Sequence, residues 1–539
     1  MSGEMGQRIL IYDTTLRDGT QGEEISFTTE DKIKIAKKLD EFGVDYIEGG
    51  WPGSNPKDMD FFEAMKSLPL RNAKLVAFGS TCRPASRPED DENLASLVEA
   101  GTDVVTIFGK SWDLHVKEAL SSTLDRNLEL ISESVRYLKS FGKEVIYDAE
   151  HFFDGYKSNR DYALATLAAA ERGGADSIVL CDTNGGTLTR EVYEITSYVR
   201  RVTDLPLGIH AHNDSELAVS NTIAAVEAGC VQVQGTVNGI GERCGNANLC
   251  SVMPILSLKM NRSFSASGRL VKLTELSRFV SEVSNIPHRK NLPYVGQSAF
   301  AHKGGVHVSA VMKNARTYEH IEPDLVGNSR RVLVSDLSGK SNVLFKAKEL
   351  DVKLPKNNGE ISAIVKEIKK LENEGYVFED ADASLRMLIE KHIGKMRANF
   401  ELEALRIIIE KKAGNEKTHT EAVIKVRVGE SVEHTAAEGN GPVNALDNAL
   451  RKALSNFYPE LSQTRLTDYK VRVVDGSKGT AAKVRVLIEA SDDMTSWNTV
   501  GVSENIIEAS WQALVDSINY KLMQNKDLKI NETTMEVTR

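Results

Sequence analysis

Short apolar runs recur along the first 260 residues, and longer stretches with apolar residues at helical spacing separate them. The short runs predict buried strands, and stretches such as 29–42 and 161–172 predict amphipathic helices. Eight runs follow one another at intervals of roughly thirty residues, at 8–12, 44–49, 74–79, 103–108, 144–149, 177–181, 207–211 and 231–235. Several of the predicted helices end in glycine, the usual residue at a helix C-terminus, at Gly43, Gly101, Gly142, Gly173 and Gly229.

The alternation of strands and helices predicts the fold class of the N-terminal part. Eight β/α units within about 250 residues are typical of a (β/α)8 TIM barrel, which we expect over residues 1–270. A doubly wound open sheet is the competing α/β arrangement. No GxGxxG motif follows the first run to support a dinucleotide-binding fold.

The pattern changes twice after the predicted barrel. Residues 271–400 indicate a helical linker and dimerisation subdomain, with helices at 361–374 and 383–393 and a polar linker at 356–359. From 401 to 539 we expect an α+β domain, with strands at 401–411, 420–428, 469–474 and 483–489 and helices at 447–454 and 511–522. Apolar positions of these two helices align in the pairs Ala445/Ala509, Ala449/Ala513 and Leu450/Leu514, which indicates an internal duplication.

Composition narrows the possible partners. The chain of 539 residues has 67 lysines and arginines against 77 aspartates and glutamates, and this acidic balance argues against nucleic acid as a partner. No apolar run is long enough to cross a membrane, and the N-terminus lacks the apolar core of a signal peptide. The five cysteines show no CxxC spacing, which fits reduced thiols. We therefore expect a cytoplasmic protein.

Polar residues gather just past the ends of the predicted strands. In a barrel these positions open into one shared mouth, where such enzymes place their chemistry. The set comprises Arg17, Asp18, Glu48, Trp51, Ser80, Glu150, His151, Asp182, Thr183, His210, His212, Asn213 and the segment 241–246. The run 12–21 has an alternative interpretation, since aspartate and threonine are also ordinary caps before a helix.

His210 and His212 are the most specific functional signal in this set. Residues two apart on a strand face the same side, here the barrel interior. Two imidazoles and a carboxylate are a common arrangement for a divalent metal. Asp18, at the end of the first strand, supplies the carboxylate. The alternative is an HxH sequence that arises by chance.

Two further segments are candidates for chemistry. Glu150 lies across the mouth from Asp18 and could act as a general base, although a solvated loop acid or a helix cap is the alternative. The glycine-rich loop 239–247 follows the eighth strand, where barrels often bind anions. A flexible turn is the other interpretation of that loop.

Three motifs together, DTTLRDG at 13–19, HAHND at 210–214 and GERCGNA at 241–247, resemble the DRE-TIM metallolyase family. Members of that family condense acetyl-CoA with 2-oxo acids or catalyse the related lyase reactions. The resemblance extends through 298–307 and 318–321 into the C-terminal domain, and so covers nearly the whole chain.

The resemblance implies a role for each matching residue. Asp18, His210 and His212 would hold a divalent cation (manganese, magnesium or zinc), with Asn246 as a further or nearby ligand. Arg17 would contact the substrate and stabilise the developing oxyanion or enolate, and Glu150 would help to remove a methyl proton of acetyl-CoA. Thr183 would bind the carboxylate of the keto acid. His307 would reach the site from the partner protomer.

One departure from the family concerns His307. Many relatives carry a His-x-Asp-Gly sequence, whereas this chain has His307-Val308-Ser309-Ala310. The missing aspartate leaves the orientation of His307 open.

Within the family, the segments 48–58 and 148–155 resemble the branch that uses pyruvate. Trp51 and the bulky Phe152 and Phe153 are compatible with a small keto-acid pocket. The expected reaction is a Claisen-type condensation of acetyl-CoA with pyruvate, followed by thioester hydrolysis. The alternatives are an isopropylmalate or homocitrate synthase, or a catalytically silent amino-acid sensor, which would be expected to lack Asp18, His210 or His212.

The C-terminal domain resembles the LeuA-type regulatory domain of the isopropylmalate synthase group, which binds an end-product amino acid at a dimer interface. For a pyruvate-using member, this implies isoleucine as the effector, the first step of a threonine-independent isoleucine route, and a homodimer. A dimerisation domain without a ligand is the alternative.

Overall fold

The structure is a computed structural model that describes residues 8–355, 357–396, 398–411 and 418–537. The chain divides into two compact units. The first comprises Met1–Phe300 with Ile321–Arg330, and the second comprises Ala301–His320 with Arg331–Arg539. Each unit is described by itself.

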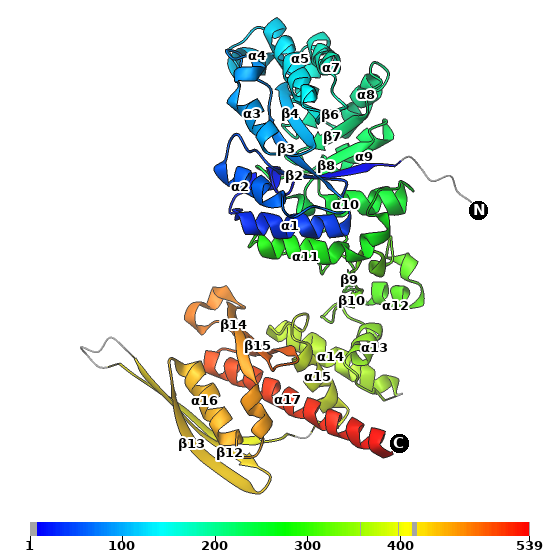
Figure 1. Cartoon of the computed structure of the whole chain (residues 1–539). Coiled ribbons are helices and arrows are strands. Elements are labelled where there is room, and N and C mark those ends of the chain that lie inside the picture. The colour runs from blue at the N-terminus through cyan, green and yellow to red at the C-terminus, as the bar shows by residue number, and fades with distance from the viewer. Residues whose placement is uncertain (1–7, 356, 397, 412–417, 538–539) are drawn as a thin grey trace. The chain divides into compact units, whose positions relative to one another are not determined.

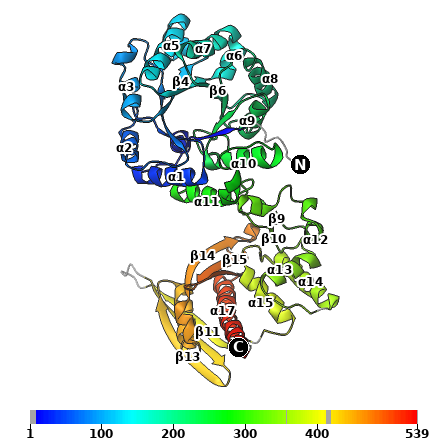
Figure 2. The same cartoon turned by 45° about the vertical axis from the view of Figure 1, so that its right-hand side comes forward.

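Eight parallel strands of the first unit close into a barrel, which confirms the predicted TIM-barrel fold (Figures 1 and 2). The strands are β1 (Leu10–Asp13), β2 (Tyr46–Gly50), β3 (Lys74–Ser80), β4 (Val104–Lys110), β5 (Glu144–Glu150), β6 (Ser177–Asp182), β7 (Leu207–Ala211) and β8 (Gln232–Gly235). Closure comes from β1, whose Tyr12 lies opposite Tyr46 of β2 and Gln234 of β8.

Helices surround the barrel and bury their apolar faces against the strands (Figure 2). They are α1 (Thr29–Phe42), α2 (Pro56–Met65), α3 (Glu92–Glu99), α4 (Asp113–Glu118), α5 (Leu124–Ser140), α6 (Phe152–Ser158), α7 (Arg160–Gly173), α8 (Thr189–Val199), α9 (Ala218–Glu227), α10 (Leu249–Pro254) and α11 (Leu273–Val283). The amphipathic segment 29–42 coincides with α1, which begins at a capping box on Thr28 and ends at Gly43 with φ of 95°.

One predicted glycine cap is wrong. Gly173 is the last residue of α7, and Gly174, with φ of 93°, takes the left-handed position after the helix. Gly173 instead permits close packing, because a Cβ there would lie 2.7 Å from the Val135 side chain and 2.8 Å from the Ser132 carbonyl oxygen. Gly174 therefore ends the helix, whereas Gly173 allows α7 to pack closely against α5.

The barrel interior is mainly apolar below its carboxyl end, although Gln232 and Thr106 are also buried there. A buried cluster of inward-facing side chains fills it, comprising Tyr12, Tyr46, Val76, Val104, Ile146, Val179 and Cys181. The polar inward residues described below lie above or beside this packed layer, where their electrostatic interactions are less screened than in water.

The second unit begins with small helical and strand elements: β9 (Ala301–His302), α12 (Gly305–Lys313), β10 (Arg331–Val332), α13 (Lys340–Glu349), α14 (Asn358–Glu374) and α15 (Asp382–His392). The predicted helices at 361–374 and 383–393 correspond to α14 and α15. The linker expected at 356–359 is wrong where it is described, because Asn357 caps α14 and the helix starts at Asn358. Lys356 lies outside the described residues.

Two β-β-β-α repeats form the rest of the second unit. The first contains β11 (Glu401–Glu410), β12 (His419–Val428), β13 (Ser431–Gly439) and α16 (Pro442–Leu454), and the second contains β14 (Arg465–Val473), β15 (Val484–Ser491), β16 (Ser496–Ser503) and α17 (Ile506–Val537). Each repeat is an antiparallel sheet packed against its helix (Figure 1). The first strand of each sheet has a register shift at its start, at Leu402/Ala404 and Leu466/Asp468. This correspondence supports the internal duplication.

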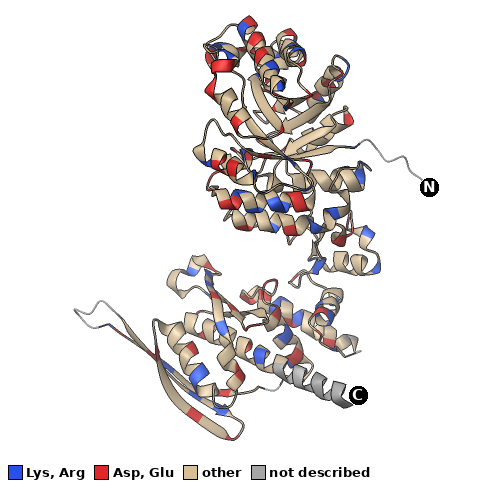
Figure 3. Cartoon of the chain, viewed as in Figure 1, with Lys and Arg blue, Asp and Glu red and all other residues tan. Residues whose placement is uncertain are grey.

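Charge is mixed along the surface helices. Both acidic and basic residues occur along α1 and α5 of the barrel (Figure 3). Among the described residues, no helix is both long enough and apolar enough to span a bilayer.

Candidate active site

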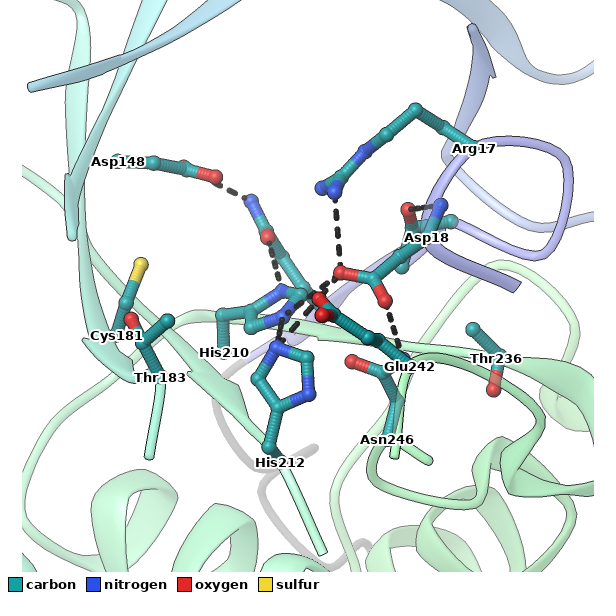
Figure 4. A network of polar contacts seen from close by, with 12 residues as sticks. Arg17, Asp18, Asp148, Cys181, Thr183, His210, His212, Thr236, Glu242 and Asn246 are labelled. Carbon is teal, nitrogen blue, oxygen red and sulfur yellow. Dashed lines mark hydrogen bonds and ion pairs between the residues drawn. The ribbon is translucent and has the colours of Figure 1, made fainter. Parts of the chain in front are cut away.

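A cavity of about 170 Å³ lies at the carboxyl end of the barrel strands. Eight residues expected from the sequence line it: Arg17, Asp18, Trp51, Glu150, Thr183, His210, His212 and Glu242. Five others line it as well: Gln21, Phe78, Phe108, Asp148 and Cys181. Figure 4 shows Arg17, Asp18, Asp148, His210, His212 and Asn246 converging from different elements.

Asp18, His210 and His212 form a buried cluster whose potential ligand atoms all lie within 4.8 Å of one another. The Asp18 Oδ2 atom is 3.5 Å from His210 Nε2 and 3.8 Å from His212 Nε2, and the two Nε2 atoms are 3.3 Å apart. Asp18 comes from the turn after β1, and the histidines come from β7 and the residue just past it. One carboxylate and two imidazoles at this separation fit a divalent cation.

The charges around this cluster favour the ligand forms of Asp18 and His212, whereas the nearby Asp18 outweighs burial and raises the pKa of His210. Burial alone would raise the pKa of Asp18, but Arg17, His210 and His212 outweigh burial and hold that pKa well below its ordinary value. Burial and the neighbouring His210 lower the pKa of His212 to about 4. Asp18 is therefore an anion and His212 a neutral imidazole near pH 7, as metal binding requires.

Asn246 contacts the cluster through Asp18. Its Nδ2 atom donates to Asp18 Oδ1 at 2.9 Å, while its buried Oδ1 atom has no hydrogen-bond partner among the protein atoms. The glycine-rich loop makes this approach possible, since a Cβ on Gly241 would lie 2.1 Å from Asn246 Nδ2. The expected ligand is thus beside the cluster, with an oxygen atom still available.

Arg17 is held on three sides at the edge of the cavity. Its Nε atom donates to Glu48 Oε2 at 2.6 Å and its Nη1 atom donates to Asp18 Oδ2 at 3.0 Å. The guanidinium carbon lies 3.7 Å from the centre of the Phe78 ring. Glu48 itself is fully buried beneath Arg17, where it also accepts from Tyr12 and Thr14.

Glu150 and Thr183 stand on the other side of the cavity. Glu150, at the end of β5, is ion-paired with Lys110 at the end of β4. Thr183 Oγ1 accepts from the His151 backbone N–H at 2.9 Å, which leaves its hydroxyl proton free to donate. Arg243 fixes the loops nearby, because Nη2 donates to the Thr183 carbonyl at 2.7 Å and the guanidinium forms a bidentate pair with Asp214.

An aromatic wall closes part of the cavity. The Trp51 ring meets Phe78 and Phe108 edge to face, with centroid distances of 5.8 and 5.5 Å, and its Nε1 atom donates to Asn93 at 2.7 Å. Phe152 and Phe153 take no part in this wall, and the expectation that they narrow the pocket is wrong. His151, with φ of 54°, immediately precedes α6, and both rings are fully buried in the hydrophobic core that the helices share with the outer faces of the strands.

Other residues of the predicted set have structural partners instead. Asp182 accepts from Thr187 Oγ1 at 2.8 Å, Asn213 Oδ1 accepts from the Ala218 backbone N–H at 3.2 Å, and the Ser80 hydroxyl donates to the Thr81 carbonyl. The imidazole of His151 lies 3.3 Å from Asp154. None of these four residues lines the cavity.

Sequence reasoning missed Asp148 and Gln234. Asp148 lines the cavity, and burial together with the nearby Glu48 raises its pKa to about 7. Gln234 lies opposite His210 in the β7–β8 register and bonds to it. The period of two along a strand was the available signal, because Asp148 precedes Glu150 by two positions.

His307 belongs to the second unit, on α12. Its ring stacks on Tyr318, with centroids 4.2 Å apart and an interplanar angle of 29°. This contact orients the imidazole in a chain that lacks the aspartate of the His-x-Asp-Gly sequence. The catalytic part expected for His307 stays a prediction.

Comparison with protein families defines the class of protein. Residues 8–280 match the HMGL-like family, residues 294–376 match a homocitrate synthase post-HMGL domain-like family, and residues 379–522 match the LeuA allosteric (dimerisation) domain. The fold and the site thus define an HMGL-like barrel protein with a C-terminal LeuA domain.

Full-length relatives place the chain more narrowly. It is 57% identical to an (R)-citramalate synthase of Aquifex aeolicus over 97% of this chain and 99% of that protein. It is also 57% identical to an (R)-citramalate synthase of Geobacter sulfurreducens, with the same coverage of both chains. A probable 2-isopropylmalate synthase of Methanopyrus kandleri is 34% identical over 97% of this chain and 100% of that protein. The chain belongs to the (R)-citramalate synthase family, which confirms the expected resemblance to metallolyases and to their pyruvate-using branch.

Proposed function

We propose that this chain is an (R)-citramalate synthase that condenses acetyl-CoA with pyruvate. A new carbon–carbon bond joins the acetyl methyl carbon to the keto carbon of pyruvate, and water then cleaves the thioester to release citramalate and CoA. The observation that carries the proposal is the cavity, in which a cation site, a guanidinium and a carboxylate converge beside an aromatic wall. The identity of 57% to proteins of this name over nearly the full chain supports it.

Asp18, His210 and His212 are the residues that would hold a divalent cation, with Asn246 Oδ1 available as a further donor. Their oxygen and nitrogen donors fit manganese, magnesium or zinc. When bound, the cation supplies Lewis-acid polarisation of the keto group. All three residues are present, which disfavours the silent sensor.

The remaining side chains divide the work of the condensation. The methyl group of a thioester is a weak acid, so its enolisation needs a base and stabilisation of negative charge. Glu150 takes the proton, Arg17 stabilises the developing oxyanion, and Thr183 donates to the carboxylate of pyruvate. Their places around one cavity support these roles.

Pyruvate is the keto acid that this cavity suits. The wall formed by Trp51, Phe78 and Phe108 offers an apolar surface for a methyl group. A larger branched acid would have to displace rings that already contact one another. For this reason the pyruvate reaction is favoured over the isopropylmalate and homocitrate reactions.

The test is CoA release from acetyl-CoA, followed with a thiol reagent. Pyruvate, 2-oxobutyrate, 2-oxoisovalerate and 2-oxoglutarate are offered separately, each with and without EDTA. A preference for pyruvate that EDTA abolishes would support the proposal. A preference for 2-oxoisovalerate or 2-oxoglutarate would mean that the chain catalyses the isopropylmalate or homocitrate reaction instead. Full activity in EDTA would mean that the reaction does not need a metal.

Enlarging the aromatic wall is expected to change substrate preference. Phe108→Ala makes room for an additional methyl group, so kcat/KM for 2-oxobutyrate relative to pyruvate should rise by about tenfold or more. Phe141→Ala is the matched control, because Phe141 is half exposed at the end of α5. An unchanged ratio in Phe108→Ala would mean that the wall does not contact the substrate side chain.

The LeuA domain supports regulation by an amino acid and assembly as a homodimer. We propose isoleucine as the effector, and His307 as a residue that serves the site of the partner protomer. The proposed biological step is the first in an isoleucine route that does not use threonine.

Isoleucine is expected to inhibit CoA release more strongly than leucine or valine, and to protect amides in the two sheets of the second unit from hydrogen exchange. The full chain is the right sample, because a cut at residue 400 would divide a shared core: Leu385 and Ile389 of α15 pack in one cluster with Val500 and Val502 of β16. Protection confined to the barrel would place the effector site elsewhere.

A further inference from the structure

A buried chain of hydrogen bonds runs across the barrel from His210 to Asp148. His210 Nδ1 lies 2.9 Å from Gln234 Oε1, and Gln234 Nε2 donates to Asp148 Oδ1 at 3.2 Å. The three residues come from β7, β8 and β5, and their exposed fractions are 4%, 0% and 3%. Figure 4 shows Asp148 and His210 with the dashed contacts that join them through this chain.

The donors and acceptors in this chain have one consistent order. Asp148 presents a carboxylate oxygen, so the amide nitrogen of Gln234 faces it. The amide oxygen of Gln234 then faces His210 and can only accept, which keeps a proton on His210 Nδ1. The lone pair of the neutral imidazole is consequently on Nε2, the atom that lies 3.5 Å from Asp18 and 3.3 Å from His212.

We propose that Gln234, oriented by Asp148, is a positioning residue that selects the metal-binding tautomer and ring orientation of His210. A histidine ligand commonly depends on the partner of its other nitrogen in this way. If the amide were reversed, its N–H2 group would face Nδ1 and the proton would move to Nε2, which blocks the ligand atom. The inference rests on the metal-dependent function proposed above.

The other histidine of the cluster does not have such a partner. His212 Nδ1 is buried and makes no hydrogen bond to the protein. Of the two histidines, only His210 is therefore oriented by a hydrogen bond at Nδ1. Loss of Gln234 should directly weaken cation binding.

Strand β8 offers a matched control two positions before Gln234. Gln232 is the same residue type, is 3% exposed, and its Oε1 atom has no hydrogen-bond partner. The change Gln232→Leu is thus chemically identical to Gln234→Leu, but it removes no bond to His210.

The experiment titrates EDTA-treated, dialysed protein with Mn²⁺ and measures free Mn²⁺ by its electron paramagnetic resonance signal. Gln234→Leu is expected to weaken Mn²⁺ binding by about 10–100-fold, and Gln232→Leu should stay near the wild-type affinity. Asp148→Asn should weaken it less. The double change Asp148→Asn with Gln234→Glu exchanges acid and amide. The bond between positions 148 and 234 then runs in the reverse direction, but position 234 still presents an oxygen acceptor to His210 Nδ1, so most of the affinity should be restored.

Wild-type affinity in Gln234→Leu, or an equal loss in Gln232→Leu, would overturn the proposal. If Gln234→Leu fails to fold, the comparison of Asp148→Asn with the double change decides, and failure of the double change to recover affinity would overturn it. Wild-type protein that binds Mn²⁺ but releases no CoA with any keto acid would contradict the proposed function while leaving the positioning role intact. Wild-type protein that does not bind Mn²⁺ would contradict the positioning role.

Discussion

Replacing Arg17 with alanine is expected to lower kcat by about 10²–10³-fold, the usual contribution of a preorganised donor at a developing oxyanion. Arg17 is set in place before substrate arrives, by Glu48, Asp18 and the Phe78 ring. The measurement is steady-state CoA release with saturating pyruvate.

The alanine variant has a folding cost that must be separated from its catalytic cost. Arg17 is the cation beside the fully buried Glu48, and removing one partner of a buried ion pair leaves an uncompensated charge. The double change Arg17→Ala with Glu48→Gln removes both charges and keeps an amide that can bond Tyr12 and Thr14. Asp18 loses the guanidinium but keeps His210 and His212 beside it, so the double variant should melt closer to wild type than Arg17→Ala and remain inactive. Turnover near wild type in the double variant would refute the oxyanion role.

The barrel could be predicted because its signal is local and repeated. Each strand is a short apolar run, and the segment predicted as the first helix coincides with α1. Strands β13 and β16 were missed because they lack such a run: β13 reads SVEHTAAEG and is largely exposed or half-buried. Backbone hydrogen bonds to β12 hold β13 in the sheet, and these bonds cannot be inferred from the amino-acid composition of β13.

The candidate site divides in the same way. The proximity of Asp18, His210 and His212 could be predicted from the sequence, because the strand period puts both histidines on one face and barrel closure brings the first strand beside the last ones. Glu48 was expected at the mouth, but the structure buries it under Arg17. Its burial depends on the ion pair with Arg17, which the sequence pattern does not reveal. Asp148 shares the strand period of Glu150, but its link to His210 through Gln234 depends on the register across the barrel strands, which no single segment of sequence contains.

Replacing Glu150 with glutamine should lower kcat by about 10²–10⁴-fold, the usual contribution of a positioned general base. Glutamine keeps the shape of the side chain but cannot take the methyl proton. The structural cost should be small, because Lys110, the ion-pair partner, retains 17% side-chain exposure and access to water.

Strand β5 supplies the control for this change. Glu144 starts the same strand, accepts from Tyr46 at 2.8 Å and is ion-paired with Lys74, at the end remote from the cavity. Glu144→Gln should leave kcat within about twofold of wild type, since surface ion pairs contribute little. The split between kinetic constants then decides the role of Glu150. A fall in kcat with little change in KM for pyruvate fits a base that acts in the transition state, whereas a rise in KM with kcat retained would make Glu150 a substrate-binding group.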